Sequence, residues 1–371
     1  MTRDVAHVVP TDYSGATLAQ RSDGIMSPER AAKPKILTLQ AGRALAALAV
    51  VLHHAGLASS DFHGAFFGEN VLVLGWLGVD FFFVLSGFII AHTVFTSQRG
   101  LANYASARVR RVYLPYLPVG IGIALIYSFV PGLSQGNHAW SWLTSITLLP
   151  LDADPALTVA WTLKHEILFY LVFGISYFGG FLRVGLALWG LAIAAAQFTA
   201  WKHHVPLELI NLEFFAGIAV AVAYQRGWTL RWVWLGAPAV WFCWILTGCN
   251  REFSVLVGLG FAFLLPPLMA LENAGKLSVS PTLVFLGAAS YAICLVHNPV
   301  ISAVARLIPF GGWAFVIIAV AAGTAGGTGY YWLIERRILA WRPAGSATVK
   351  PTHPDIAVDQ IGTAPSARLE P

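Results

Sequence analysis

The fold is decided by the stretch of residues 71–95, which reads VLVLGWLGVDFFFVLSGFIIAHTVF. Only Asp80 and His92 carry an ionisable side chain among its 25 residues. A helix that crosses the hydrocarbon core of a bilayer needs about 20 consecutive, mostly apolar residues. The stretch therefore predicts a transmembrane helix.

Other apolar runs of similar character lie near residues 42–59, 114–131, 160–180, 183–200, 206–225, 230–248, 253–271, 283–307 and 312–334. Hydrophobic residues make up 57% of the chain and charged residues only 11%, whereas soluble proteins carry about 25% charged residues. A surface so poor in charge is stable only against lipid. We therefore predict an all-α, polytopic membrane bundle of about ten transmembrane helices, with the lipid bilayer as its main partner.

Polar tails flank the apolar runs. Residues 1–35 show neither the apolar core nor the cleavage site of a signal peptide. We predict a disordered cytoplasmic tail at 1–35, a transmembrane domain at 36–342 and a second disordered cytoplasmic tail at 343–371. The apolar segment 139–150 is too short to cross a bilayer, so we interpret it as interfacial or re-entrant.

Basic residues set the predicted topology. With the N-terminus inside, 18 of the 23 lysines and arginines fall on the inner side, and the outer loops hold only Lys202, Arg251 and Arg306. Cytoplasmic loops of membrane proteins carry such an excess, so both termini are predicted to be cytoplasmic and the number of spans even. Because these residues lie between apolar runs instead of clustering on one folded face, we expect no nucleic-acid partner.

The three cysteines, Cys243, Cys249 and Cys294, lie in or beside apolar segments. Their number is odd and their spacing fits no metal site. We interpret them as small apolar core residues and predict no bound metal.

Ionisable side chains inside a membrane are costly unless they are paired or hydrated, so each is a functional candidate. Arg43 and His54 are 11 residues apart, which at 100° and 1.5 Å per residue places them within about 20° of one helix face and about 16 Å apart. Arg43 is predicted at the cytoplasmic mouth and His54 near the middle of the bilayer. This pair would suit an anionic cofactor whose reactive arm reaches the histidine. A membrane-surface arginine and a histidine bound to a backbone carbonyl would produce the same pattern.

Arg108, Arg110 and Arg111 follow the second span. Arg108 and Arg111 lie three residues apart and share a face if this segment is helical. Two guanidinium groups on one face suit a diphosphate or a ribose phosphate. Ordinary positive-inside anchoring is the alternative for this cluster.

Two carboxylates fall in the predicted outer half of their spans. Asp80 precedes Ser86 and Gly87, a small pair that permits close helix packing. Glu166 follows Trp161, Lys164 and His165, and the latter two could pair with it as a structural cluster. A buried carboxylate beside a histidine is equally suited to orient an imidazole or to act as a base.

The remaining candidates are Glu213, flanked by Leu212 and Phe214, and the pair Ser290 and His297. Ser290 and His297 are seven residues apart, again nearly on one helix face. Taken together, the candidates place arginines at the inner mouth and His, Asp and Glu in the middle and outer half. That layout fits a donor from the cytoplasm and an acceptor reached from the middle or outer side.

These residues occur in a characteristic order: Gln40-x-x-Arg43 with ten residues before His54; Gly78-Val-Asp80-Phe-Phe-Phe-Val-Leu-Ser86-Gly87-Phe88; Arg108-x-x-Arg111 followed by Pro115; Trp161-Thr-Leu-Lys-His-Glu166-x-x-x-Tyr170; Glu213-Phe-x-x-Gly217; and Ser290-Tyr-Ala-Ile-Cys-Leu-Val-His297. In these motifs, over about residues 38–335, the chain resembles the membrane acyltransferase 3 family. Within it, the resemblance is to the exopolysaccharide-production (ExoZ-like) branch.

The resemblance implies ten helices, an acyl-CoA donor (usually acetyl-CoA) and O-acylation of a carbohydrate. It also implies that Arg43 and His54 form the core pair and that Arg108 and Arg111 help to hold the donor. Cys294 departs from the pattern, because it replaces an aromatic residue common in the final motif. His53 lies beside His54, but the ten-residue spacing favours His54.

We therefore hypothesise an O-acyltransferase of the bacterial cytoplasmic membrane that acts on a cell-surface or exported polysaccharide or on its lipid-linked precursor. Acyl-CoA would bind through Arg43, Arg108 and Arg111, and His54 would act as a general base or carry the acyl group. Glu166 would orient the imidazole or steer the acceptor. The alternatives are a family member that acylates a small molecule such as a macrolide, and a transporter of polysaccharide precursors. A transporter would more often show an internal repeat with broken helices, which the sequence does not display.

Overall fold

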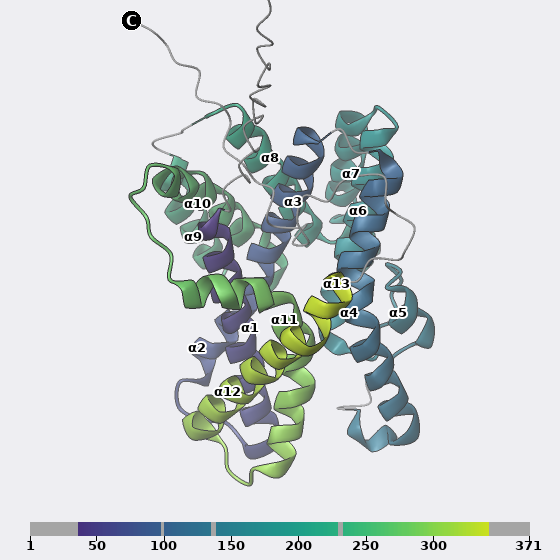
Figure 1. Ribbon diagram of the computed structural model, residues 1–371, viewed down its shortest axis with the longest axis vertical. Helices are drawn as coiled ribbons and strands as arrows, with labels where there is room; N and C mark the ends of the chain where they lie inside the picture. Colours follow the sequence, from purple (N-terminus) through teal and green to yellow (C-terminus); the bar gives the residue numbers. More distant parts are fainter. Residues whose placement is uncertain (1–35, 98–99, 135–138, 229–232, 341–371) are drawn as a thin grey trace, which may run out of the picture. The chain divides into compact units, whose positions relative to one another are not determined.

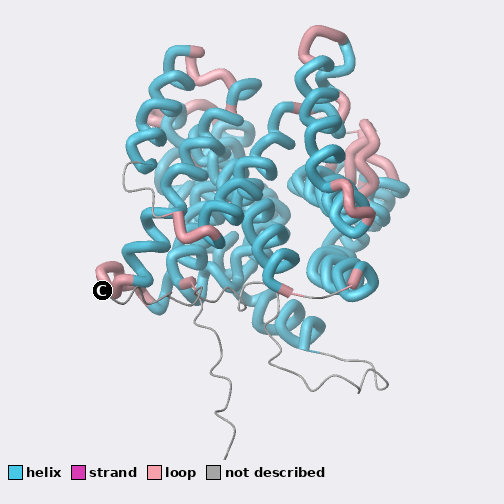
Figure 2. Tube along the Cα trace, turned by 90° about the horizontal axis from the view of Figure 1, so that it is seen from above, coloured by secondary structure: helices cyan, strands magenta, loops and turns pink. Residues whose placement is uncertain are grey.

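The computed structural model describes residues 36–97, 100–134, 139–228 and 233–340, all of which belong to the compact unit Lys33–Pro371. The predicted tails at 1–35 and 343–371 lie outside the described residues. Helices joined by short loops account for the described chain (Figure 2). No strand occurs in these ranges, and one isolated bridge pairs Trp140 with Asp154.

Seven helical segments are long and apolar enough to cross a membrane. They contain α1 (Leu37–His63), α2 (Glu69–Val73) continued by η1 (Leu74–Leu77) and α3 (Gly78–Thr96), α4 (Leu101–Phe129), α6 (Trp161–Phe178), α10 (Val255–Asn273), α11 (Pro281–Leu307), and α12 (Gly312–Tyr330) continued by the π-helical turn η10 (Tyr331–Glu335) and α13 (Arg336–Ala340). The shorter helices are α5 (Trp142–Thr147), α7 (Leu182–Ala196), α8 (Leu212–Gln225) and α9 (Gly236–Leu246). The protein is therefore an all-α, multi-pass membrane protein.

The helices differ from the predicted spans in two ways. First, α4 begins at Leu101, not near residue 114, so the basic cluster belongs to the helix itself. The prediction followed apolar residues alone and therefore excluded this basic turn. Second, the predicted spans at 183–200, 206–225 and 230–248 correspond to apolar helices of fewer than 18 residues. The segment predicted as interfacial or re-entrant contains α5, whose Ser145 carbonyl accepts a hydrogen bond from Tyr116 of α4 at 2.7 Å.

α1 packs against α11 and α12, which also pack against each other (Figure 1). Glu272 at the end of α10 accepts hydrogen bonds from the backbone N–H groups of Leu37 and Thr38 at 2.5 and 2.8 Å. The carboxylate therefore satisfies two of the unpaired donors with which every helix begins. Contacts of α1 with α11 join Arg43 to Ser290 and His54 to His297. Because the residue numbers rise together, the two helices run in the same general direction.

α3 and α8 lie against each other with their backbones in close approach. A Cβ atom on Gly87 would lie 2.2 Å from the Phe214 carbonyl oxygen, and one on Gly217 would lie 2.0 Å from that of Val84. Small residues permit this kind of packing between membrane helices. Further along, the ring of His92 packs against that of Tyr224, so α3 and α8 also run in the same direction.

Candidate active site

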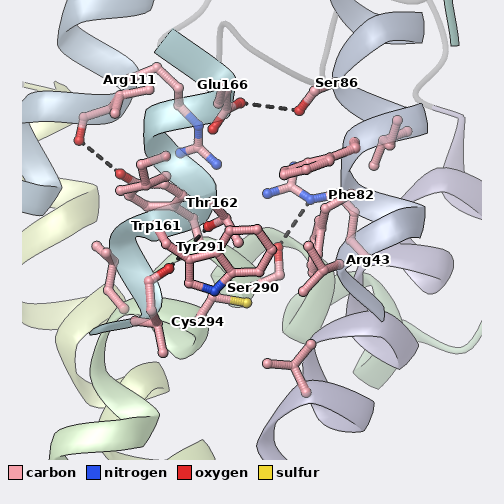
Figure 3. A pocket seen from close by; sticks show the side chains of 18 of the residues that line it. Arg43, Phe82, Ser86, Arg111, Trp161, Thr162, Glu166, Ser290, Tyr291 and Cys294 are labelled. Carbon is pink, nitrogen blue, oxygen red and sulfur yellow. Dashed lines mark hydrogen bonds between the residues drawn. The ribbon is translucent and has the colours of Figure 1, made fainter. Parts of the chain in front are cut away.

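A cavity of about 160 Å³ lies among α1, α3, α4, α6 and α11. Nine of the eleven side chains singled out in the sequence line it: Arg43, His54, Ser86, Arg108, Arg111, Trp161, Glu166, Ser290 and His297. Figure 3 shows Arg43, Arg111 and Glu166 pointing into the same space from different helices. Residues separated by up to 254 positions in the chain, Arg43 and His297, thus share one site.

Three arginines, Arg43, Arg108 and Arg111, line the cavity. Arg43 Nε donates a hydrogen bond to Ser290 Oγ at 3.0 Å, and Arg43 and Arg108 are both buried. The Arg108 guanidinium lies 5.8 Å from the centre of the Tyr170 ring, and its Nε is buried without a hydrogen-bond partner. The sequence predicted Arg43 at the cytoplasmic mouth. The Arg43 side chain is buried, and α1 begins six residues before it, which corresponds to about 9 Å along the helix.

Arg111 has a partner that sequence reasoning missed. Arg111 Nη1 donates to Glu335 Oε1 at 2.6 Å, and the Glu335 side chain is fully buried. Glu335 ends the π-helical turn η10, and such turns frequently occur at functional sites. Its sequence signal was weak, because Glu335 directly follows the last apolar run and precedes Arg336 and Arg337, which suggested a surface loop.

Two histidines meet at the side of the cavity. His54 Nδ1 lies 2.9 Å from the Val50 carbonyl oxygen and 3.3 Å from His297 Nε2. His297 Nδ1 lies 2.9 Å from the Ile293 carbonyl oxygen. His53 does not line the cavity, and its Nδ1 lies 3.3 Å from the Leu72 carbonyl oxygen.

Glu166 is held by hydroxyl groups. Its Oε1 accepts hydrogen bonds from Ser86 Oγ at 3.1 Å and from the Tyr170 hydroxyl. No hydrogen bond joins Glu166 to His54, so the imidazole is oriented by other groups. The sequence also suggested that Lys164 and His165 pair with Glu166, which is wrong, because successive helix positions point about 100° apart.

Those two side chains instead bind the loops near the start of α6. Lys164 Nζ donates to the Ala153 carbonyl at 3.2 Å, and His165 Nδ1 lies 2.9 Å from Asn211 Oδ1. His165 Nε2 lies 3.8 Å from Glu208 Oε2. Burial raises the pKa of the Glu208 carboxyl to about 7, although the charges of Lys164 and Arg251 lower it.

These loops are also tied to one another. An ion pair joins Lys202 to Glu252 at 3.2 Å, and His204 Nδ1 lies 2.8 Å from Asp152 Oδ2. The Arg251 guanidinium lies 5.6 Å from the Trp161 ring and 5.4 Å from the Trp76 ring. Trp161 therefore lies between the cavity and this group of charged loops.

Asp80 and Glu213 do not belong to the cavity. Both are fully buried where α3, α8 and α10 meet, and each carboxyl group lies next to the other and to Ser254. Their four oxygens make no well-formed hydrogen bond within the described structure. The sequence could not show that these two carboxylates, 133 positions apart, face each other.

The cysteines also differ from the prediction that all are core residues. Cys243 and Cys249 are exposed, and Cys294 is half-buried. Cys294 lines the cavity between Ser290 and His297 on α11. No group of three or more His, Cys, Asp and Glu side chains suited to a metal occurs in the part of the chain that the structure describes.

An apolar bundle that encloses arginines, an imidazole and a hydroxyl-bound carboxylate in one cavity has the properties of a membrane enzyme that handles an anionic substrate. Residues 36–332 match the acyltransferase domain of the acyltransferase 3 family. The chain belongs to this family of membrane acyltransferases.

Two curated relatives are similar over most of their length. The exopolysaccharide production protein ExoZ of Rhizobium meliloti (strain 1021) is 30% identical over 310 residues, which cover 75% of this chain and 94% of the relative. The acyltransferase MdmB of Streptomyces mycarofaciens is 26% identical over 278 residues, which cover 62% of this chain and 70% of the relative. No solved structure matches the chain.

Proposed function

We propose that this chain transfers an acyl group, in the simplest case acetyl, from acyl-CoA to a hydroxyl of a cell-surface or exported polysaccharide or of its lipid-linked precursor. The observation that carries the proposal is the single cavity lined by Arg43, Arg108, Arg111 and His54. Similarity to a protein named for exopolysaccharide production supports a glycan acceptor. Family membership favours transfer over transport.

Only the reactive end of the donor would enter the cavity. Sites that enclose a whole drug-sized ligand measure about 300–1,000 Å³, which is more than the 160 Å³ of this cavity. The thioester and the adjoining arm would therefore lie inside, while the phosphates of the nucleotide would be bound by the arginines. Arg43 uses only Nε for Ser290, so its two terminal nitrogens are available for phosphate oxygens.

His54 would act as the general base. Its imidazole takes the proton of the acceptor hydroxyl while the hydroxyl oxygen attacks the thioester carbon. The C–S bond then breaks, and the thiolate that leaves takes the same proton back from the imidazole. Glu166, held by Ser86 and Tyr170, would steer the acceptor toward this position.

The topology is proposed with the function: ten crossings of a bacterial cytoplasmic membrane, with both termini in the cytoplasm. The helix directions support it. Four long helices lie between α1 and α11 in the chain. If only these four crossed the membrane between them, α1 and α11 would be antiparallel. Because they run in the same direction, an odd number of the shorter helices α7, α8 and α9 must also pass from one side to the other.

The test uses a strain that lacks the gene, complemented at matched protein level with the wild type, His54→Gln or His53→Gln. The measured quantity is the ratio of acylated to free glycan by mass spectrometry. We expect His54→Gln to lose about 10²-fold or more of the acylation, because glutamine can fill the space but cannot carry the proton. His53→Gln should keep most of the activity, since His53 lies outside the cavity. Normal acylation by His54→Gln would refute the mechanism.

A further inference from the structure

Three short contacts fix the nitrogens of the His54 and His297 rings. The Nδ1 atoms of His54 and His297 both lie 2.9 Å from a backbone carbonyl oxygen one helical turn earlier, that of Val50 and of Ile293. The Nε2 atom of His297 lies 3.3 Å from His54 Nδ1. His54 Nε2 makes no hydrogen bond to the described residues, and the His54 side chain lines the cavity.

These contacts permit one arrangement of protons on the neutral rings. A carbonyl oxygen only accepts hydrogen bonds, so both Nδ1 atoms must carry a hydrogen. A neutral imidazole with a hydrogen on Nδ1 has its lone pair on Nε2. His297 therefore offers a lone pair to the N–H of His54, whose hydrogen is shared between His297 and the Val50 carbonyl. A second hydrogen on His297, at Nε2, would place the N–H groups of His297 and His54 against each other.

We propose that His297 is a positioning residue that holds the neutral His54 as the Nδ1–H tautomer, with the Nε2 lone pair facing the cavity. This inference rests on the proposed role of His54 as base. Glu166 does not perform this task, because its hydrogen bonds go to Ser86 and Tyr170. The lone pair on Nε2 takes the hydroxyl proton as the acyl C–O bond forms, and Nε2 returns it to the sulfur as the C–S bond breaks. His297 keeps its own protons throughout.

The environment of His297 suits a fixed orientation. Its side chain is fully buried, and Gly323 of α12 lies against its Cβ, where an added methyl group would come within 3.3 Å. The ring therefore has little room to rotate. In other enzymes a base held in the wrong tautomer loses about 10⁴-fold in kcat.

Two amide substitutions separate positioning from simple filling of space. In His297→Asn the amide reaches the place of Nδ1 and can still donate to the Ile293 carbonyl, but it leaves nothing at the place of Nε2. In His297→Gln the longer side chain can put its oxygen near the place of Nε2, where it accepts from His54. We expect His297→Asn to lose about 10²- to 10⁴-fold in kcat with the donor KM unchanged. His297→Gln should recover most of this loss.

The second measurement does not depend on activity. ¹⁵N NMR of histidine-labelled protein distinguishes protonated from unprotonated ring nitrogens, and the His54 signals are assigned by their loss in His54→Gln. We expect Nε2 of His54 to be unprotonated in the wild type and in His297→Gln, and a mixture of tautomers in His297→Asn. Equal activity of the Asn and Gln variants, or a protonated Nε2 in the neutral wild-type ring, would overturn the proposal. Full activity of His54→Gln would instead refute the proposed function, whatever the tautomer.

Discussion

Arg108 and Arg111 look alike in the sequence, but their surroundings differ. Arg111 is paired with the fully buried Glu335 at 2.6 Å. Removing one partner of a buried ion pair costs about 3–5 kcal/mol, because the other charge stays buried and unpaired. Arg108 has an aromatic ring beside it and a buried Nε with no hydrogen-bond partner. Arg108 is therefore the arginine whose replacement tests donor binding without breaking an ion pair.

We expect Arg108→Ala to weaken acyl-CoA binding by about 10- to 100-fold, the loss of one hydrogen-bonded charge at a phosphate. Arg108→Lys should restore part of this affinity, because lysine supplies the charge but not the planar fork. Binding to protein in detergent is measured by isothermal titration calorimetry. Arg110→Ala is the matched control, since Arg110 belongs to the same turn but does not line the cavity. Equal affinity of the wild type and Arg108→Ala would return Arg108 to a role in membrane anchoring.

Helical periodicity located part of the site from the sequence. The 11-residue spacing of Arg43 and His54 predicted a shared face, and both line the cavity while His53 does not. Glu335 could not be found in this way, because its partner Arg111 lies 224 positions earlier. The contact depends on the π-helical turn at the end of α12. Periodicity shows which face a residue occupies but not what the face meets.

At the scale of elements, the length of each apolar run predicted the presence of a helix better than it predicted where the helix begins and ends. The run 71–95 corresponds closely to the segment Glu69–Thr96. The start of α4 was missed because its first turns carry three arginines, which the apolar criterion assigned to a loop. Two of them, Arg108 and Arg111, line the cavity, and a charged side chain is tolerated within a membrane bundle where it faces such an interior. The cavity of a membrane enzyme is lined by polar side chains, so hydropathy alone does not predict the ends of the helices that carry them.

The close approach of α3 and α8 gives a prediction for Gly217 of α8. We expect Gly217→Ala to lower the stability by about 1–3 kcal/mol, because the new methyl group meets the Val84 carbonyl. Gly122→Ala in α4 is the control, since nothing lies within 4 Å of its added Cβ. Alanine there should be neutral or stabilising by up to about 1 kcal/mol. Thermal unfolding in detergent measures both. Identical unfolding temperatures for the two variants would contradict the close packing of α3 on α8.

For the whole molecule, the loops that join the helices fall into two groups. Lys202 and Glu252 form an ion pair at 3.2 Å, so the loops before α8 and before α10 lie on the same side. The ends of α3 and α8 lie together on the other side, because these helices run in the same direction. The distribution of basic residues in the sequence predicted that the same two groups of loops lie on opposite sides of the membrane. Gly136, which is also predicted to lie in an outer loop, is outside the described residues.

Reporter fusions test this topology. A phosphatase that folds only in the periplasm should be active when it is fused after Lys202 or Arg251 and inactive after Gly100 or Gly227. A reporter that fluoresces only in the cytoplasm should give the opposite pattern at the same four sites. The expectation rests on the excess of basic residues at the inner side. Periplasmic activity of fusions at both Gly100 and Lys202 would be incompatible with ten crossings.

The bond between Arg43 and Ser290 links residues 247 positions apart, and this separation has a consequence during synthesis. A ribosome that adds 5–20 residues per second needs roughly 12–50 s to make the chain between them. During that time α1 already carries its arginine into the translocon or the bilayer, where α11 does not yet exist to receive it. The first helix to be made is thus among the last to find its partner, and the cavity is completed only when α11 leaves the ribosome.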